Sequence, residues 1–165
     1  MKSNVQIRIA SPDESEAIAK VIRQAFAEMQ FLYTPEAFAV TTPNAETIRE
    51  RFGESVIWAA LKNETIVGTV CAVPEEGGRL YVRSMAVLPS AQGLGIGRKL
   101  LDAIEYYALE NKFKNLFLYT LPFLSGAIRL YEKNGFERGE DTGPEEFYGM
   151  PGMTMEKKLI RTGKL

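Results

Sequence analysis

The chain lacks most of the side chains on which nucleophilic and metal-dependent enzymes rely. It has no histidine and a single cysteine, Cys71, among 165 residues. These absences exclude Ser–His and Cys–His nucleophiles, a disulfide within the chain and a Cys-rich zinc site, so no metal centre is expected. Cys71 stands between Val70 and Ala72 without a basic neighbour in sequence, which is typical of a small core residue rather than of an acyl-carrying nucleophile.

The chain also has no excess of charge of either sign and no long apolar run. Its 20 basic and 21 acidic residues give a net charge of −1. Nucleic acid and anionic membranes usually select a basic excess or a basic face, so neither is expected as a partner. No run approaches the roughly 18 apolar residues of a membrane span. Charges at Lys2, Arg8, Asp13 and Glu14 leave no signal-peptide core, and a cytoplasmic location is expected.

The length of 165 residues predicts one domain, residues 1–165, with a substantial core. No internal repeat, low-complexity tract or linker divides the sequence. The most informative stretch is 92–97, Gln-Gly-Leu-Gly-Ile-Gly, between a strand-like run ending at 85–89 and a helix-like run at 98–104. Strand, glycine loop and helix form a phosphate-binding arrangement, because glycines let an anion approach backbone N–H groups at the positive end of a helix dipole.

The spacing of the glycines separates this loop from two better-known phosphate loops. A P-loop, G-x-x-x-x-G-K-[ST], needs a glycine where Arg98 stands. The dinucleotide fingerprint G-x-G-x-x-G needs its third glycine where Arg98 or Leu100 stands. Neither pattern fits, whereas Gln-x-x-Gly-x-Gly does.

In this loop the chain resembles the GNAT superfamily of acyl-CoA N-acyltransferases, whose pyrophosphate loop reads [Arg/Gln]-x-x-Gly-x-[Gly/Ala] after a strand. A second signature follows at 127–136, Ala-Ile-Arg-Leu-Tyr-Glu-Lys-Asn-Gly-Phe, a short helix that carries a Tyr before Gly-Phe. The resemblance is strongest over residues 56–137. It implies direct transfer of an acyl group, usually acetyl, from CoA to an amine, with acetyl-CoA as cosubstrate.

Hydrophobic periodicity and turn signals extend the agreement to most of the chain. Period-two and continuous apolar runs predict strands, and i, i+3, i+4 spacing with Ser11 and Ser125 as N-caps predicts helices. The predicted strands are 5–10, 56–61, 65–74, 79–88, 115–121, 136–141 and 153–159, and the predicted helices are 11–29, 44–52, 98–111 and 125–134. These elements predict an α/β fold with a mixed, mostly antiparallel sheet of about seven strands and helices on both faces, which is the GNAT-like architecture that the resemblance implies. The strand at 115–121 should be central and buried on both faces.

The resemblance also implies where the cosubstrate binds. In the family the fourth and fifth strands splay apart, and the pantetheine arm lies in the resulting V against the backbone of the fourth strand. The cosubstrate-binding residues so implied, with neighbours that offer charge or a helix start, are Met85, Val87, Gln92, Gly93, Leu94, Gly95, Ile96, Gly97, Arg98, Lys99 and Ser125. The aromatic-rich connection at 30–43 is typical of core cover, and in the family this region forms one wall of the acceptor site.

The reaction poses two proton problems. Tyr131 matches the family's Tyr and is the candidate catalytic residue, a phenol that donates to the departing CoA thiolate; the alternative is a Tyr packed on a helix face. Many relatives have a Glu in the fourth strand as base, but 80–84 reads Leu-Tyr-Val-Arg-Ser and has no carboxylate. Arg83 could meet an acidic group on the acceptor, or it could be solvated or salt-bridged.

Other carboxylates and functions stay open at this point. Glu75, Glu76, Glu145 and Glu146 are solvated turn residues or the end of a water chain to the amine, and Tyr148 lies in the same late loop. The alternative function is a non-catalytic acyl-CoA-binding sensor, which needs neither Tyr131 nor a polar acceptor pocket. The acceptor amine stays unassigned, and a homodimer is an expectation of the family.

Overall fold

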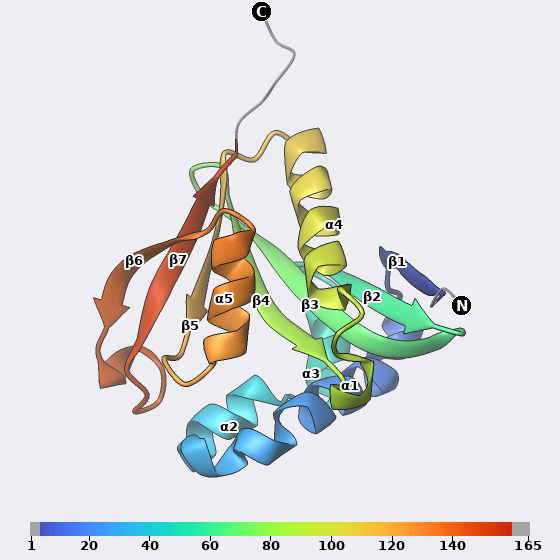
Figure 1. Cartoon of the computed structure of the whole chain (residues 1–165), viewed down its shortest axis with the longest axis horizontal. Coiled ribbons are helices and arrows are strands. Elements are labelled where there is room, and N and C mark those ends of the chain that lie inside the picture. The colour runs from blue at the N-terminus through green and yellow to red at the C-terminus, as the bar shows by residue number, and fades with distance from the viewer. Residues whose placement is uncertain (1–3, 160–165) are drawn as a thin grey trace, which may run out of the picture.

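The computed structural model describes residues 4–159, which form one seven-stranded sheet between helices (Figure 1). The strand order is β1-β2-β3-β4-β5-β7-β6. The strands span Val5–Ile9 (β1), Val56–Lys62 (β2), Thr65–Glu75 (β3), Arg79–Val87 (β4), Asn115–Thr120 (β5), Glu137–Thr142 (β6) and Gly152–Lys158 (β7). Neighbouring strands are antiparallel except β4 and β5, which are parallel. The predicted mixed, mostly antiparallel sheet is confirmed.

Helices cover both faces of the sheet, as predicted. Helices α1 (Ser15–Phe26) and α3 (Ala45–Arg51) pack on one face, where Ile18 and Ile48 join a buried cluster with Ile57 of β2. Helices α4 (Ile96–Glu110) and α5 (Ser125–Lys133) cover the other face. None of the helices within residues 4–159 is long and apolar enough to cross a membrane.

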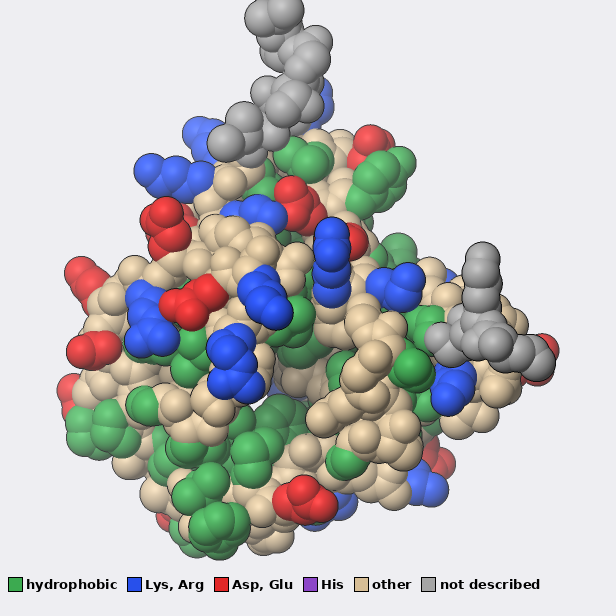
Figure 2. All heavy atoms as spheres, viewed as in Figure 1, with side chains coloured by type: hydrophobic (Ala, Val, Ile, Leu, Met, Phe, Trp, Pro, Cys, Tyr) green, Lys and Arg blue, Asp and Glu red, His purple; other side chains and the backbone are tan. Residues whose placement is uncertain are grey.

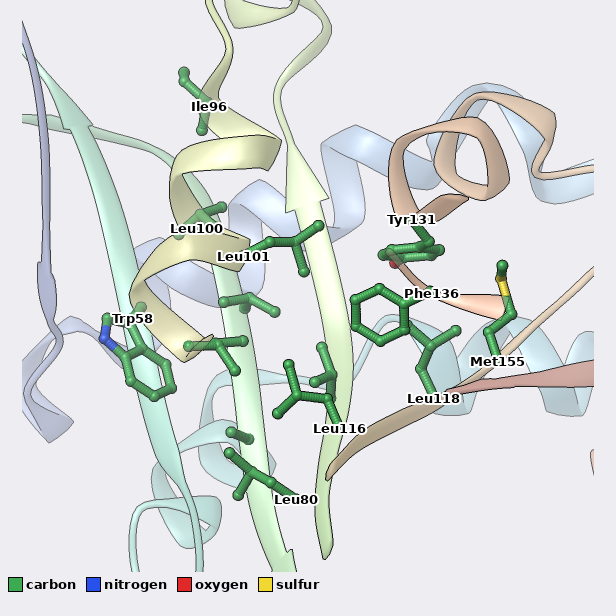
Figure 3. Packing of buried hydrophobic residues seen from close by; sticks show 14 of the residues in the cluster. Trp58, Leu80, Ile96, Leu100, Leu101, Leu116, Leu118, Tyr131, Phe136 and Met155 are labelled. Atoms are coloured by element: carbon green, nitrogen blue, oxygen red, sulfur yellow. The ribbon is translucent and has the colours of Figure 1, made fainter. Parts of the chain in front are cut away.

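The core under α4 fixes the position of the glycine loop. Ile96, Leu100 and Leu101 of α4 belong to the same buried cluster as Leu80 of β4 and Leu116 of β5 (Figure 3). All five side chains are buried, and burying one such side chain stabilises the fold by about 1.5–3 kcal/mol. The first turn of α4 is therefore held firmly on the edge of β4, and the loop before it is held with it.

The pairing of β4 determines where the sheet opens. β4 pairs with β5 through three residue pairs, from Arg79–Asn115 to Tyr81–Phe117, and the two strands then diverge. In its ladder with β3, β4 carries one extra residue, because Thr69 pairs with Ala86 and the next recorded pair is Cys71 with Arg83. Such a bulge bends a strand and is common beside active sites. The V implied by the family resemblance is present.

Three local predictions need correction. The segment 30–43 contains a helix, α2 (Pro35–Thr41), whose start the Thr34 Oγ1 caps by accepting from the Ala37 N–H at 3.1 Å. Ser125 does not cap α5: Leu124 occupies the N-cap position and no side chain caps it. β5 is not buried on both faces, since Tyr119 is 53% exposed where the sheet has opened.

Candidate active site

A cavity of about 850 Å³ crosses the opening between β4 and β5. It is lined by the glycine loop and the start of α5 at one end, and by residues from α1, α2, the β6–β7 connection and the tips of β4 and β5 at the other. Figure 2 shows this face hollowed at its centre, with basic side chains along the upper rim and hydrophobic side chains along the lower one. The cavity therefore offers two chemically different ends that meet in the opened sheet.

The glycine loop is shaped to admit an anion. Gly93 and Gly95 have φ of +87° and +74°, and a Cβ built on either glycine would meet no atom within 4 Å. Gly95 is the N-cap of α4, a helix of 15 residues whose dipole is positive at this end. Backbone N–H groups at a helix start in open space are the arrangement that binds phosphate, and the site fits a pyrophosphate.

The third glycine of the loop has a different purpose. A Cβ on Gly97 would lie 2.7 Å from Cδ2 of Leu130 in α5, so a larger residue would force the Leu130 side chain to move. The glycine thus sets the spacing of α4 and α5 on either side of the opening. It acts through packing, whereas Gly93 and Gly95 leave room for a ligand.

Most of the predicted cosubstrate residues line the cavity. Those that do are Met85, Val87, Gln92, Gly93, Gly95, Ile96, Gly97, Arg98 and Ser125. Leu94 instead packs against the buried cluster under α4, and Lys99 lines a separate groove beside Asp102 and Tyr106. Beyond Tyr81 the β5-facing edge of β4 has no strand partner among residues 4–159, which leaves that edge free for a ligand next to Met85 and Val87.

Tyr131 lines the same cavity from α5. Its side chain is 8% exposed and packs against the Phe136 ring at 5.7 Å between centroids, with the hydroxyl end turned toward β4 (Figure 3). Burial raises the pKa of the Tyr131 phenol above its ordinary value. No partner for the hydroxyl is found within the described part of the chain, so the proton is held and available for donation to a ligand.

The other end of the cavity is aromatic and carries few charges. Phe26, Tyr33, Tyr119 and Phe147 contribute rings, and Tyr33 contacts Phe123 edge to face at 5.1 Å. Burial also raises the pKa of Tyr33, to about 12. The charged lining residues are Arg83, Arg98 and Glu146, and Glu75, Glu76, Glu145 and Tyr148 lie outside the lining.

Ser84 and Arg51 belong to this end and were missed by sequence reasoning. Ser84 lines the cavity with φ of +57°, and its Oγ accepts a hydrogen bond from Arg51 Nη1 at 3.0 Å. A left-handed φ at a non-glycine residue within a strand has no sequence signal, and Arg51 looks like an ordinary basic residue at the end of a helix. Only the packing of α3 against β4 brings the two together.

An open sheet, a glycine loop at a helix start and a cavity that joins them define the class of acyl-CoA-dependent acyltransferases. The sequence profile of the acetyltransferase (GNAT) family matches residues 16–136. An uncharacterised N-acetyltransferase of Escherichia coli K12, YjgM, is 32% identical over 141 residues, which cover 82% of this chain and 83% of the relative. The chain therefore belongs to the GNAT acetyltransferase family.

Solved structures agree with this assignment. The ribosomal-protein-S18-alanine N-acetyltransferase of Escherichia coli superposes with a TM-score of 0.79 at 17% identity, covering 98% of this chain and 97% of its own. The PaiA N-acetyltransferase of Thermoplasma acidophilum, solved with coenzyme A, gives 0.74 at 20% identity, covering 94% and 99%. At this identity the likeness establishes the fold. Family membership makes the chain an acyltransferase with acetyl-CoA as its cosubstrate.

The placement of Arg98 and Lys99 predicts that these neighbours behave differently. Arg98→Gln should raise the dissociation constant of acetyl-CoA about three- to tenfold at low ionic strength, because it removes a charge from the phosphate end of the cavity. Lys99→Gln, facing the other groove, should change it little. Calorimetric titrations at two salt concentrations measure both effects. An equal rise of the acetyl-CoA dissociation constant in both variants would contradict the prediction, because it would show that a charge near the loop aids binding whether or not it lines the cavity.

Proposed function

We propose that the chain is an N-acetyltransferase that moves an acetyl group from acetyl-CoA directly to a primary amine of a small molecule or protein. The observation that supports this most is the continuous cavity, which joins the glycine loop to an aromatic acceptor end across the opened sheet. An amine that enters from the acceptor end and a thioester that enters from the loop end would meet beside β4. Holding two reactants in this way removes much of the entropic barrier to their reaction.

Direct transfer suits the side chains that are present. Acetyl-CoA supplies the activated acetyl thioester; the amine nitrogen forms a bond to the carbonyl carbon, and the carbon–sulfur bond breaks. Cys71 cannot serve as an acyl carrier, because it is 2% exposed and burial raises the pKa of its thiol. The enzyme needs no nucleophile of its own and supplies position, a donor for the thiolate and an exit for the amine proton.

Tyr131 is the residue we assign to the thiolate. A thiol has a pKa of about 8.5 and a phenol one of about 10, and burial raises the Tyr131 value further. Full proton transfer from the phenol to the thiolate is therefore uphill. The hydroxyl acts by donating a hydrogen bond to the negative charge that develops on sulfur as the bond breaks.

The exit of the amine proton depends on water or on the acceptor itself. An aliphatic ammonium of pKa about 10.4 is neutral in about one molecule of 2,500 at pH 7, a handicap of roughly 4.6 kcal/mol. Glu146 is the one carboxylate that lines the cavity in the described chain, and it is exposed at the end of a short 3-10 helix (Pro144–Glu146). We propose that a water chain ending at Glu146 or in bulk solvent carries the proton, and that acceptors with lower amine pKa react best.

The test is a screen of amines with acetyl-CoA in which release of the free thiol is monitored. The panel holds amino acids, peptides with free N-termini, polyamines and aminoglycosides, each at several pH values. Acetylation of at least one amine, confirmed by the mass of the product, is the expected result. Tight binding of acetyl-CoA without turnover of any amine would contradict the proposed enzyme and favour a non-catalytic sensor of acyl-CoA.

A further inference from the structure

A buried arginine that has no carboxylate within 4 Å among residues 4–159 lies behind the acceptor end of the cavity. Arg51, at the end of α3, is 8% exposed, and its guanidinium donates to the neutral Ser84 hydroxyl. The ion pairs found within residues 4–159 join Arg8 to Glu14, Arg98 to Asp102, Arg138 to Glu132 and Lys157 to Glu105. Arg51 is in none of them. A buried charge without a partner is costly, and it is usually present where a ligand supplies the opposite charge.

A second guanidinium lies beside the first. Arg83 precedes Ser84 on β4, lines the cavity, and sits with its Cζ 5.8 Å from the centroid of the Tyr81 ring. It has no carboxylate within 4 Å in the described chain either. Burial lowers the pKa of Arg51, and the positive charge of Arg83 lowers it further, which places the two cations near each other. Cys71, Tyr81 and Glu54 act in the opposite direction on the pKa of Arg51.

Ser84 connects this pair to the cavity. The bulge and the left-handed backbone at Ser84 turn its hydroxyl to where Oγ accepts from Arg51. Since that oxygen is the acceptor, its own proton remains free to be donated, and no acceptor for it is found between residues 4 and 159. Arg83, the Ser84 hydroxyl and Arg51 behind it thus form a group of donors with a net charge of two.

We propose that the amine acceptor carries a carboxylate, which Arg83 binds directly and Ser84 binds through a hydroxyl that Arg51 orients. This inference rests on the proposed acetyl transfer and names the class of its substrate. A carboxylate fills both needs of the group, because it accepts several hydrogen bonds and neutralises buried positive charge. Polyamines and aminoglycosides bring further positive charge to the same place and are excluded. The aromatic lining around the group favours an acceptor with an apolar body.

The experiment compares amines that differ only in the carboxylate. L-phenylalanine is matched with phenethylamine, and L-leucine with 3-methylbutylamine, in steady-state assays with acetyl-CoA. The acid of each pair should have a kcat/KM about 10- to 100-fold above its partner after correction for the fraction of neutral amine, the usual effect of one charge-assisted hydrogen bond. In Arg83→Gln that ratio should fall to near unity.

Two further variants separate binding from folding. Arg51→Met should reduce the same ratio through Ser84, and the ratio is insensitive to a loss of folded protein because both substrates share one enzyme sample. Arg79→Gln is the matched control: Arg79 lies on the same face of β4, over the Phe117 ring at 3.8 Å, and outside the cavity lining. It should retain the wild-type ratio.

A binding arm distinguishes failure of this inference from failure of the proposed reaction. Calorimetry of the CoA-saturated protein with N-acetyl-L-phenylalanine and with N-acetylphenethylamine requires no turnover. Tighter binding of the acid by about tenfold or more, lost in Arg83→Gln, supports the carboxylate site even if no amine reacts. Equal binding of acid and neutral compound, no binding of either, or a preference that survives Arg83→Gln would overturn it.

Discussion

Tyr131→Phe is expected to lower kcat by roughly 10²- to 10³-fold while the dissociation constant of acetyl-CoA stays nearly the same. The hydroxyl meets negative charge only as the carbon–sulfur bond breaks, so its loss affects the transition state and leaves the bound ground state almost unchanged. Phe keeps the ring and its contact with Phe136. Since the hydroxyl has no partner among the described residues, the melting temperature should hold or rise slightly.

Three measurements on this variant decide the role of Tyr131: kcat with an identified acceptor, calorimetric affinity for acetyl-CoA, and melting temperature. Tyr107→Phe is the matched control, because Tyr107 is a helical, partly buried Tyr that contacts Trp58 at 5.4 Å and lines a different groove. It should retain kcat. Full activity in Tyr131→Phe, or a loss equal to that of the control, would remove Tyr131 from catalysis.

Gly95→Val should raise the dissociation constant of acetyl-CoA by about 100-fold or more. The added side chain would occupy the open space where a pyrophosphate meets the helix start, and each lost charge-assisted hydrogen bond costs roughly tenfold or more in affinity. A branched residue at φ of +74° is also strained by about 1–3 kcal/mol, so some loss of stability is expected. Calorimetry and thermal unfolding separate the two effects.

Gly77→Val provides the comparison for Gly95→Val. Gly77 lies in the turn between β3 and β4 with φ of +81°, and a Cβ there meets nothing closer than 4.0 Å. Its replacement imposes similar backbone strain far from the glycine loop. It should lower the melting temperature by a similar amount and leave acetyl-CoA affinity intact. If Gly95→Val binds acetyl-CoA as well as Gly77→Val does, the loop has no part in holding the phosphates.

The elements and the phosphate end of the site were predictable because their signals are local. Gly93 and Gly95 have backbone angles that other residues rarely adopt, so the glycines mark the loop in the sequence. Helix α4 buries one face, and its periodic apolar residues mark that face. The antiparallel pairs β2–β3 and β3–β4 needed only hairpin turns, and the parallel β4–β5 pair needed one crossover through α4, whereas the place of β7 between β5 and β6 was not predicted. Helix α2 escaped prediction although Thr34 and Pro35 carry the start signal.

The acceptor end could not be predicted because it depends on contacts between distant segments. Residues 33 positions apart, Arg51 and Ser84, meet only when α3 packs beneath the bulged strand. Tyr119 is exposed because β5 has diverged from β4, which no property of 115–121 reveals. Likewise Arg98 and Lys99 are adjacent in sequence, yet they lie on different sides of α4: Arg98 lines the cavity and Lys99 lines the separate groove.

The short ladder between β4 and β5 divides the sheet into two plates. Strands β1 to β4 come from residues 5–87 and strands β5 to β7 from 115–158, so each plate is one continuous part of the chain. Three residue pairs, the buried cluster under α4 and the close approach of Gly97 in α4 to Leu130 in α5 join them. A ligand in the cavity touches both plates, and binding adds about 2.7 kcal/mol to the free energy of unfolding at 100 times Kd. Bound acetyl-CoA therefore links the two plates. Without it the protein should have a lower melting temperature and should be cleaved faster by a protease.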